Sequence, residues 1–444
     1  MPEQPKLGGR SCAKQSCYNK NLQSVRKSRN TDEQMVHVRD AAGEGVSVGS
    51  RDEGQTMRFV LAPDSFKESL TAREAVDAMA RGVHSVFPDA ECVRAPMADG
   101  GEGTTEALVA ALGGQLVQAE AHDALGRPIR ATYGYAPDEQ LAVIEVAAAA
   151  GIDKVAAHER NPLTASSYGV GEIIRDALDR GARRLVVGLG GTATNDGGAG
   201  MLQALGVRLL DAEGVELPGG TAPLEGLASI DPSGIDPRLV GVSVEIASDV
   251  TNPLLGELGA SAVFGPQKGA TPEVVARLER ALGVFARAVA DLTGRDVAGE
   301  SGTGAAGGLG AAFLAFFDAH MRSGVEVVMR AARLEERLTG ADVVLTGEGA
   351  VDAQTIYGKT LLGVARSAAG LGVPVIAFAG RIGPGAEALY DHGVVAIVPI
   401  VRSVSDLSTA LVDAGPNLEL AVQMVCRIMA GTPRPGAPAA DQEV

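Results

Sequence analysis

The sequence predicts an α/β fold: a doubly wound parallel sheet with a second α/β domain inserted into it. Short apolar runs alternate with amphipathic helical stretches from Met57 onward, and the same alternation returns near the C-terminus. β-loop-α units at this spacing are typical of parallel sheets. The middle of the chain has a different character, with short hairpin-like strands and loops rich in proline and glycine.

The first strands and helices after Met57 can be predicted individually, in part because the sequence marks where a helix begins. Thr71, followed three residues later by Glu74, has the pattern of a capping box at a helix start. The elements expected here are, in order, a strand at 57–62, a helix at 72–86, a strand at 91–95 and a helix from Thr104.

The C-terminal part repeats this order. We expect a strand at 342–346, a helix at 359–370, a strand at 373–379 and a further pair within 385–400. Ligands bind at the carboxyl ends of strands in such sheets. The loops predicted at that edge are 63–70, 96–103 and 347–358.

The domain boundaries follow from these patterns. Residues 57–120 and 301–431 are expected to form the first domain and residues 121–300 the inserted one. The inserted domain should contain strands at 132–135, 141–146, 184–187, 207–211 and 242–247, and helices at 168–180, 195–205 and 272–293. Residues 1–56 are interpreted as a disordered extension or a mis-called start, and 432–444 as a disordered tail.

Composition limits the classes of partner. The net charge of −16 argues against nucleic acid, which needs clustered Lys and Arg. No run of 18 or more apolar residues is present, so we expect no membrane span. Four cysteines are too few for a disulfide framework and favour a cytoplasmic location.

The segment 343–360 carries the strongest chemical signal. An apolar run leads into a glycine-rich loop with Glu348 and Asp352, which can hold Mg²⁺, and then Lys359 and Thr360 open a helix. The segment is not a Walker A loop, because Ala353 stands where that motif requires its first glycine.

Two further loops carry polar residues after predicted strands. Asp64, Ser65 and Lys67 could bind a carboxylate or phosphate, or Asp64 and Ser65 could only satisfy turn amides. Asp99 and Glu102 could serve Mg²⁺, or could be favoured by the helix dipole alone.

The stretch 188–193 matches G-x-G-x-x-A after a predicted strand, which is a candidate dinucleotide fingerprint. Asn195 and Asp196 stand where the following helix should be apolar, which weighs against it. A weaker match contains Gly304 and Gly307 and has no strand before it. Asp249 and Lys268 lie in consecutive loops and could hold a substrate hydroxyl and carboxylate, or be a surface turn and a solvated charge.

Taken together, these segments resemble the bacterial class I glycerate kinase family over about residues 57–430. The matching stretches, in family order, are 62–70, 96–103, 190–200, 248–254, 264–269 and 346–360. Two residues depart from the family pattern: Ala350 stands where Arg or Lys is frequent, and Leu361 where Pro is common.

The resemblance implies a flavodoxin-like domain joined to a second α/β domain, and ATP-dependent phosphorylation of D-glycerate, in most members at the 2-hydroxyl. Such a site must hold triphosphate and Mg²⁺ and clamp a small hydroxy-acid. We expect Asp196 to be the base, with Asp249 in reserve, and a catalytic Lys67. The other expected roles are substrate binding by Asp64, Ser65, Asn195 and Lys268, nucleotide binding by Gly190, Gly191, Gly304, Gly307, Lys359 and Thr360, and metal binding by Glu348, Asp352 and Asp99.

Several alternatives remain open. The enzyme could phosphorylate another small hydroxy-acid, or glycerate at its 3-hydroxyl. From other classes, a nicotinamide-dependent oxidoreductase would rest on residues 188–211, and a nucleotide sensor would bind without turnover. We expect a monomer or homodimer.

Overall fold

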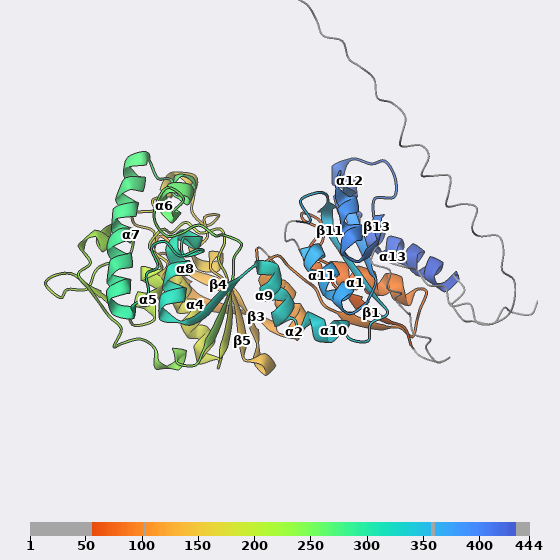
Figure 1. The fold of residues 1–444 in the computed structure, drawn as a ribbon, viewed down its shortest axis with the longest axis horizontal. Helices are drawn as coiled ribbons and strands as arrows, with labels where there is room; N and C mark the ends of the chain where they lie inside the picture. Colours follow the sequence, from red (N-terminus) through yellow and green to blue (C-terminus); the bar gives the residue numbers. More distant parts are fainter. Residues whose placement is uncertain (1–55, 102, 357–359, 432–444) are drawn as a thin grey trace, which may run out of the picture. The chain divides into compact units, whose positions relative to one another are not determined.

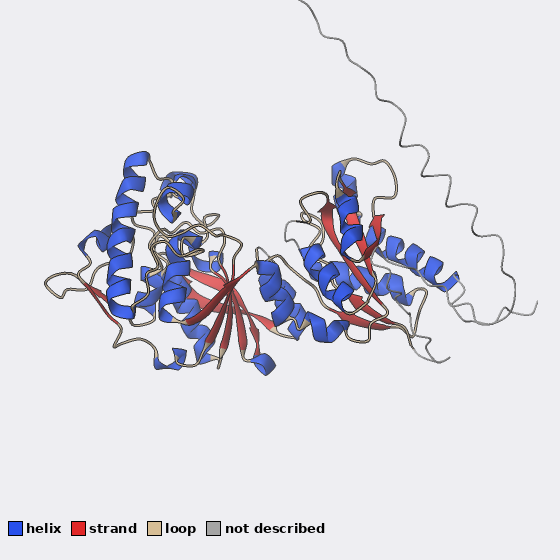
Figure 2. Ribbon diagram, viewed as in Figure 1, coloured by secondary structure: helices blue, strands red, loops and turns tan. Residues whose placement is uncertain are grey.

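The computed structural model describes residues 56–101, 103–356 and 360–431. The described chain forms two sheets of mainly parallel strands with helices packed on them (Figure 1, Figure 2). The predictions about the N-terminal extension up to residue 55, the tail from 432, Glu102 and Lys359 lie outside the described residues.

The first sheet has five parallel strands in the order β13-β12-β11-β1-β2. Numbered along the chain within this sheet, the order from β2 is 2-1-3-4-5, which is the flavodoxin order. The flavodoxin-like prediction is therefore confirmed. The strands are β1 (Arg58–Leu61), β2 (Glu91–Arg94), β11 (Val343–Val351), β12 (Val375–Ile382) and β13 (Val394–Pro399).

Helices cover both faces of this sheet. One apolar cluster joins it to α1 and α13, and another joins it to α11. Thr71 caps α1 with the predicted capping box to Glu74. The helices are α1 (Ala72–His84), α11 (Thr360–Gly370), α12 (Leu407–Val412) and α13 (Ala414–Gly431).

Strand β11 runs beyond the predicted end at residue 346, because residues 347–351 continue the parallel pairing with β12. Glu348 therefore lies in a strand, and its placement in a loop was wrong. Gly347 and Gly349 allow this extension, since a side chain at Gly347 would meet Phe378 O at 2.3 Å and one at Gly349 would lie 3.3 Å from Lys67 N.

The second sheet has the order β10-β9-β6-β5-β4-β3. Four parallel strands are extended at one edge by the antiparallel β4 and β3. The strands are β3 (Gln115–His122), β4 (Pro128–Ala136), β5 (Leu141–Glu145), β6 (Arg184–Gly188), β9 (Ser243–Ala247) and β10 (Asp318–Arg322). The exact boundaries of the inserted domain stay a prediction.

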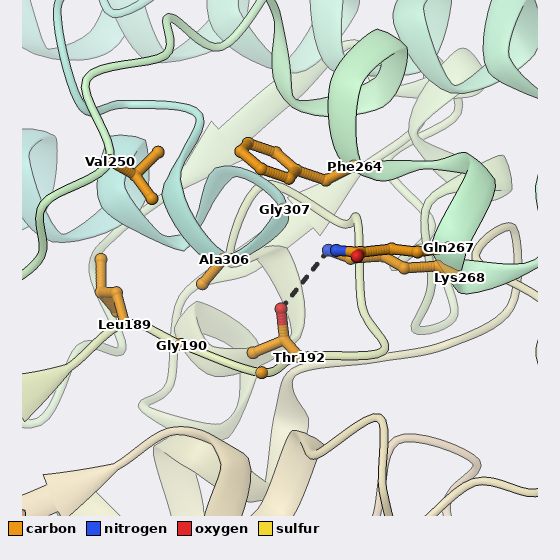
Figure 3. Close-up of a pocket in the computed structure, with 10 residues that line it drawn as sticks. Leu189, Gly190, Thr192, Val250, Phe264, Gln267, Lys268, Ala306 and Gly307 are labelled. Atoms are coloured by element: carbon orange, nitrogen blue, oxygen red, sulfur yellow. Dashed lines mark hydrogen bonds between the residues drawn. The ribbon is translucent and has the colours of Figure 1, made fainter. Parts of the chain in front are cut away.

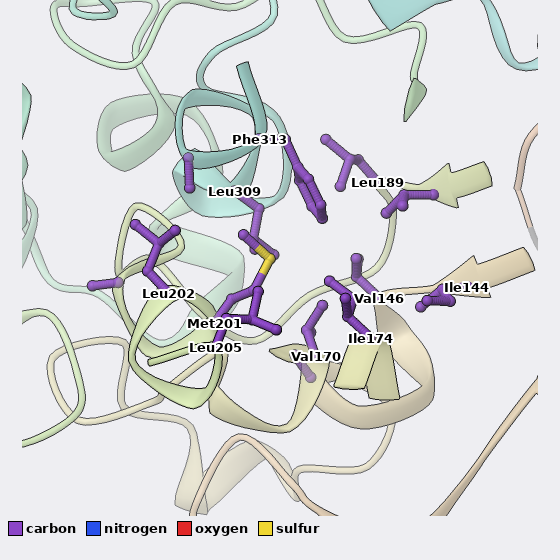
Figure 4. Close-up of a cluster of buried hydrophobic side chains, with 14 of the residues drawn as sticks. Ile144, Val146, Val170, Ile174, Leu189, Met201, Leu202, Leu205, Leu309 and Phe313 are labelled. Carbon is purple, nitrogen blue, oxygen red and sulfur yellow. The ribbon is translucent and has the colours of Figure 1, made fainter. Parts of the chain in front are cut away.

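One face of this sheet packs against an apolar core that is mainly Ala, Val, Leu and Ile with a few larger side chains, and Figure 4 shows the part around Met201 and Phe313. On the other face lie α2 and α9. The helices of this part are α2 (Thr104–Leu112), α3 (Ala147–Ala150), α4 (Tyr168–Asp179), α5 (Ala199–Ala204), α6 (Ala260–Phe264), α7 (Pro272–Thr293), α8 (Ala305–Phe316), α9 (Gly324–Ala331) and α10 (Leu334–Leu338).

The dinucleotide-binding unit considered for residues 188–211 is not formed. The strand after α5, β7 (Arg208–Leu210), pairs antiparallel with β8 (Ser229–Asp231) and does not join β6 in the main sheet. Helix α5 begins at Ala199 and not at residue 195, because Gly197 and Gly198 adopt positive φ of 66° and 82°. None of the helices among the described residues is long and apolar enough to cross a membrane.

Candidate active site

A small pocket lies at the carboxyl edge of the second sheet (Figure 3). Its volume is about 120 Å³, below the roughly 300–1,000 Å³ of pockets for drug-sized ligands. Two glycine-rich segments form walls of the pocket: the loop after β6, with Gly190 and Gly191, and the kinked start of α8, with Ala306 and Gly307. The lining residues are Leu189, Gly190, Gly191, Thr192, Val250, Phe264, Gln267, Lys268, Ala306 and Gly307. The pocket therefore suits a small ligand.

Lys268 supplies the positive charge of this pocket. It ends the short 3-10 helix Pro266–Lys268 and its side chain is buried, with 2% exposed. The ammonium donates to the carbonyl oxygen of Thr194 at 2.6 Å and to Thr192 Oγ1 at 3.4 Å. Burial lowers the pKa of Lys268 to about 8, and the negative charge of Asp196 opposes this shift. Both of these acceptors are uncharged oxygens, so the charge of the ammonium is available to attract an anion.

Asp196 is buried beneath the pocket loops. Its Oδ2 accepts hydrogen bonds from the backbone N–H and the hydroxyl of Ser167 at 2.8 and 2.9 Å and from Gly200 N at 3.2 Å. Its Oδ1 accepts from Gly198 N at 3.2 Å. Burial raises the pKa of this carboxyl group, and the hydrogen bonds from Ser167 oppose that rise. This arrangement ties the loop before α5 to the start of α4.

Asn195 lies beside Asp196 and is also fully buried. Its amide Nδ2 donates to Ser261 Oγ at 3.0 Å. Its Oδ1 and the hydroxyl of Thr194 have no hydrogen-bond partner among the described residues. Buried polar atoms without partners are uncommon in native structures, so these two mark the loop as a candidate functional segment.

The four glycines predicted for nucleotide binding differ in their surroundings. Added side chains at Gly304 and Gly307 would meet Pro253 O at 2.2 Å and Thr194 O at 2.1 Å. At Gly190 an added Cβ meets no atom within 4 Å, and at Gly191 it meets only Ala147 Cβ, at 3.7 Å. Gly304 and Gly307 thus let loops pack closely, whereas Gly190 and Gly191 leave backbone accessible to a ligand.

A second group of polar residues lies at the carboxyl edge of the first sheet. Asp64 follows β1, and its Oδ1 accepts from Ser65 N at 2.6 Å. Its Oδ2 accepts from the hydroxyl of Thr360, the first residue of α11, at 2.5 Å. Burial raises the pKa of Asp64, the Thr360 hydrogen bond opposes that shift, and the charge of Asp99 adds to it. Lys67, in the same loop, is exposed.

Asp99 connects this group to the second sheet. Its charge raises the pKa of both Asp64 and Asp249, although the partial loss of water around each carboxyl group is the larger cause. Asp249 follows β9, is exposed, and accepts a hydrogen bond at 3.3 Å from Gly324 N. The backbones of Gly100 and Gly324 pack so closely that a side chain on either would overlap the other segment. The charge of Asp99 thus acts on two other predicted carboxylates, Asp64 and Asp249.

Glu348 and Asp352 have different partners from Asp99. Glu348 Oε1 accepts from the hydroxyl of Thr355 at 2.9 Å, and Asp352 pairs with Arg381 at 3.1 Å. Within the described ranges, no group of three His, Cys, Asp or Glu side chains is arranged to hold a metal ion. Mg²⁺ commonly takes only one or two carboxylates and completes its shell with phosphate and water. The acids near Asp99 fit that donor set.

The sequence did not predict several residues of these sites. Ser167 belongs to no recognised motif, and Thr192 and Ala306 occupy variable positions within the two glycine-rich matches, where a threonine or alanine gives no chemical signal. Thr355 stood in the conspicuous loop, but its bond to Glu348 depends on the strand that precedes it. Lys67 and Lys268, both predicted, lie after strands of different sheets and have very different burial.

Comparison with known proteins identifies the family. The model of the glycerate kinase family matches residues 59–430, and this chain belongs to that family. It is 47% identical to a glycerate kinase of Haemophilus influenzae, covering 84% of this chain and 99% of the relative. It is 44% identical to a glycerate 2-kinase of Escherichia coli, covering 82% and 95%.

A solved structure agrees with this assignment. The structure described as glycerate kinase 2 from Salmonella typhimurium LT2 has a TM-score of 0.77 and 46% identity to this chain. The match covers 84% of this chain and 98% of the other. The predicted resemblance is therefore confirmed, and the protein is an enzyme of the phosphotransferase class.

Proposed function

We propose that this protein transfers the γ-phosphoryl group of ATP to the 2-hydroxyl of D-glycerate, which gives 2-phosphoglycerate and ADP. Family membership and the relative named glycerate 2-kinase support the reaction. The observation that carries the proposal is the small pocket with the buried Lys268 ammonium and accessible glycine backbone. A small anionic hydroxy-acid matches both its size and its charge.

The acceptor would bind in the pocket at the carboxyl edge of the second sheet. The Lys268 ammonium is the natural partner for the glycerate carboxylate, or for the phosphoryl group as it arrives. Thr192 holds Lys268 from one side. The backbone of Gly190 and Gly191 can approach phosphate oxygens without a side chain in the way. Positioning and charge neutralisation of this kind dominate phosphoryl transfer.

The proton of the reacting hydroxyl needs a carboxylate with an available oxygen. The sequence favours Asp196 as this base, but in the structure Asp196 is fully buried and both its oxygens accept hydrogen bonds. Asp249 is exposed next to the pocket residue Val250 and has one hydrogen bond. We therefore propose Asp249 as the base and Asp196 as the residue that holds the loop. In the step, the substrate oxygen bonds to the γ-phosphorus, the bond to ADP breaks, and Asp249 takes the proton.

The nucleotide would bind at the edge of the first sheet where the strand order reverses, between β1 and β11. Asp64, Ser65 and Thr360 lie there, and Lys359 is predicted to contact phosphate. Asp99 is the first candidate to hold Mg²⁺, with Glu348 and Asp352 as the other predicted ligands. Bound Mg²⁺ would neutralise charge on the phosphates. Lys67 remains predicted as a catalytic residue that holds the glycerate carboxylate or the transferring phosphoryl group. The cytoplasmic location and the oligomeric state also remain predictions.

A coupled assay on the full chain tests the proposal. ADP release is measured with Mg²⁺ and ATP, with and without D-glycerate, and enolase alone is added to the products to detect 2-phosphoglycerate. We expect glycerate-dependent ADP release with an enolase signal. ADP release without that signal would move the reaction to the 3-hydroxyl. If no hydroxy-acid supports turnover, the proposal is wrong, and binding of ATP or NADH would then separate a sensor from a dehydrogenase.

A further inference from the structure

The loop that forms one wall of the pocket contains an unusual backbone. Ala306, Gly307 and Gly308 are three consecutive residues in the left-handed region, with φ of 51°, 67° and 94°. Glycine adopts this conformation freely, but a residue with a Cβ rarely does. Ala306 is one of four described residues other than glycine with positive φ.

The surrounding structure forces this conformation on the loop. Gly197 N donates to Gly307 O at 3.0 Å, and the positions of Gly307 and Gly308 leave no room for side chains against Thr194 and Gly197. Ala306 therefore cannot relax without breaking the contact between the two loops. Strained residues that are fixed by their surroundings cluster at ligand sites.

The methyl group of Ala306 lies at the pocket surface. Within residues 302–314 every residue except Ala306 is buried. Figure 3 shows its side chain in the pocket wall close to Gly190 and Thr192, with Lys268 beyond. The other residue that this loop contributes to the pocket lining is Gly307. The Ala306 methyl group is thus the one side-chain group that this loop presents to a ligand.

We infer that Ala306 is a specificity-determining residue that limits the acceptor to a three-carbon acid. This inference rests on the proposed function, since it assumes that the pocket takes the hydroxy-acid. Its methyl group occupies the space that a fourth carbon of the acceptor would need, while Lys268 holds the carboxylate end. One methyl or methylene group in a pocket discriminates between ligands by about 10- to 200-fold.

The test compares two acids by calorimetric binding and by turnover, on the full chain. D-glycerate is compared with D-erythronate, which keeps the 2-hydroxy-acid end and adds one carbon. In Ala306→Gly the ratio of the two dissociation constants should shift at least about tenfold toward D-erythronate. In Ala306→Asn the longer side chain should weaken D-glycerate binding by about tenfold or more, because Asn tolerates positive φ but fills the pocket.

Gln140→Gly is the matched control. Gln140 has a φ of 47°, is exposed, and lies before β5, at the opposite end of the sheet strands from the pocket. The change relieves the same kind of backbone strain and should leave the ratio at the wild-type value, while thermal unfolding shows that each variant is folded. If the ratio of the two dissociation constants is also unchanged in Ala306→Gly, the inference is wrong.

Binding and turnover separate this inference from the proposed function. A shifted binding ratio in a protein without glycerate turnover supports Ala306 as a size limit and rejects the proposed reaction. If the enzyme turns over glycerate but the ratio of dissociation constants is unshifted in Ala306→Gly, the size-limiting role of Ala306 is rejected and the proposed reaction stands. If the wild type binds neither acid, both are rejected.

Discussion

Thr360 and Asp64, which are 296 residues apart in the chain, are joined by a hydrogen bond of 2.5 Å from the threonine hydroxyl to Oδ2 of the carboxylate. Asp64 follows β1 and Thr360 begins the helix after β11. These strands are neighbours at the point where the strand order reverses. The bond therefore joins the loop after β1 to the start of α11 at the edge of the sheet where ligands of this fold class bind.

Loss of the hydrogen bond between Thr360 and Asp64 should lower the kcat/KM of the enzyme for ATP. Thr360→Val removes the donor and raises the pKa of Asp64 further, because the hydrogen bond now opposes the effect of burial. Hydrogen bonds to charged groups contribute about 1.5–3 kcal/mol, so we expect kcat/KM for ATP to fall at least about tenfold. Thr360→Ser keeps the hydroxyl and is the control. Equal kcat/KM in wild type and Thr360→Val would contradict the role.

The Lys268 ammonium should give the enzyme an alkaline limit. Its pKa of about 8 means that it loses its charge as the pH rises through that value. We expect kcat/KM for D-glycerate to fall above about pH 8. Lys268→Met should reduce kcat/KM by about 100-fold or more and remove this limb of the profile.

The lowered pKa of Lys268 also predicts that the free energy of unfolding rises with pH, in contrast to the fall in kcat/KM. Its pKa in the folded protein lies below the ordinary 10.5. Between the two values the unfolded chain binds more protons, so stability contributed by Lys268 rises with pH across this window. Urea unfolding from pH 7 to 10 should therefore show a smaller rise in Lys268→Met than in wild type. An identical pH dependence in both proteins would disprove the lowered pKa.

Gly307 and Gly190 should respond differently to alanine. In Gly307→Ala the new Cβ would lie 2.1 Å from Thr194 O at a positive φ, so we expect a loss of unfolding free energy of about 2 kcal/mol or more. In Gly190→Ala the Cβ meets no atom within 4 Å, so stability should stay within about 0.5 kcal/mol of wild type. Urea midpoints of both variants check this, and similar losses in the two would argue against close packing at Gly307.

Substitutions of Asp249 and Asp196 should have different effects, because we propose Asp249 as the base and Asp196 as the residue that holds the loop. Asp249→Asn should keep stability and reduce kcat by at least about 100-fold. Because the pKa of Asp249 is raised above its ordinary 3.8, the acid limb of wild-type kcat should lie above that value and vanish in the variant. Asp196→Asn should lower stability by about 1–3 kcal/mol, because it disturbs a buried acceptor of four hydrogen bonds. If the pH limb vanishes in Asp196→Asn and persists in Asp249→Asn, the two roles are reversed.

Much of the fold could be predicted because its signals are local. The capping box at Thr71 and the alternation of strands and helices lie within short segments, and the structure has them. The errors occurred where long-range pairing decided the outcome. Residues 347–351 look like a loop, but β12 pairs with them and extends the strand. Long-range pairing also decides against the dinucleotide alternative at residue 188, which Asn195 and Asp196 already disfavour, because β7 pairs with β8.

The sequence by itself determined which chemical groups are available: the acids after β1, β2 and β9, the lysines, and the glycine loops, in an order that indicates the family. Only the tertiary structure decided how each group is used. It buried Asp196 under four hydrogen bonds, left Asp249 exposed, and lowered the pKa of Lys268 by removing it from water. It also made a plain alanine part of the pocket. Burial and contact join residues far apart in the chain, so residue type and local spacing cannot reveal them.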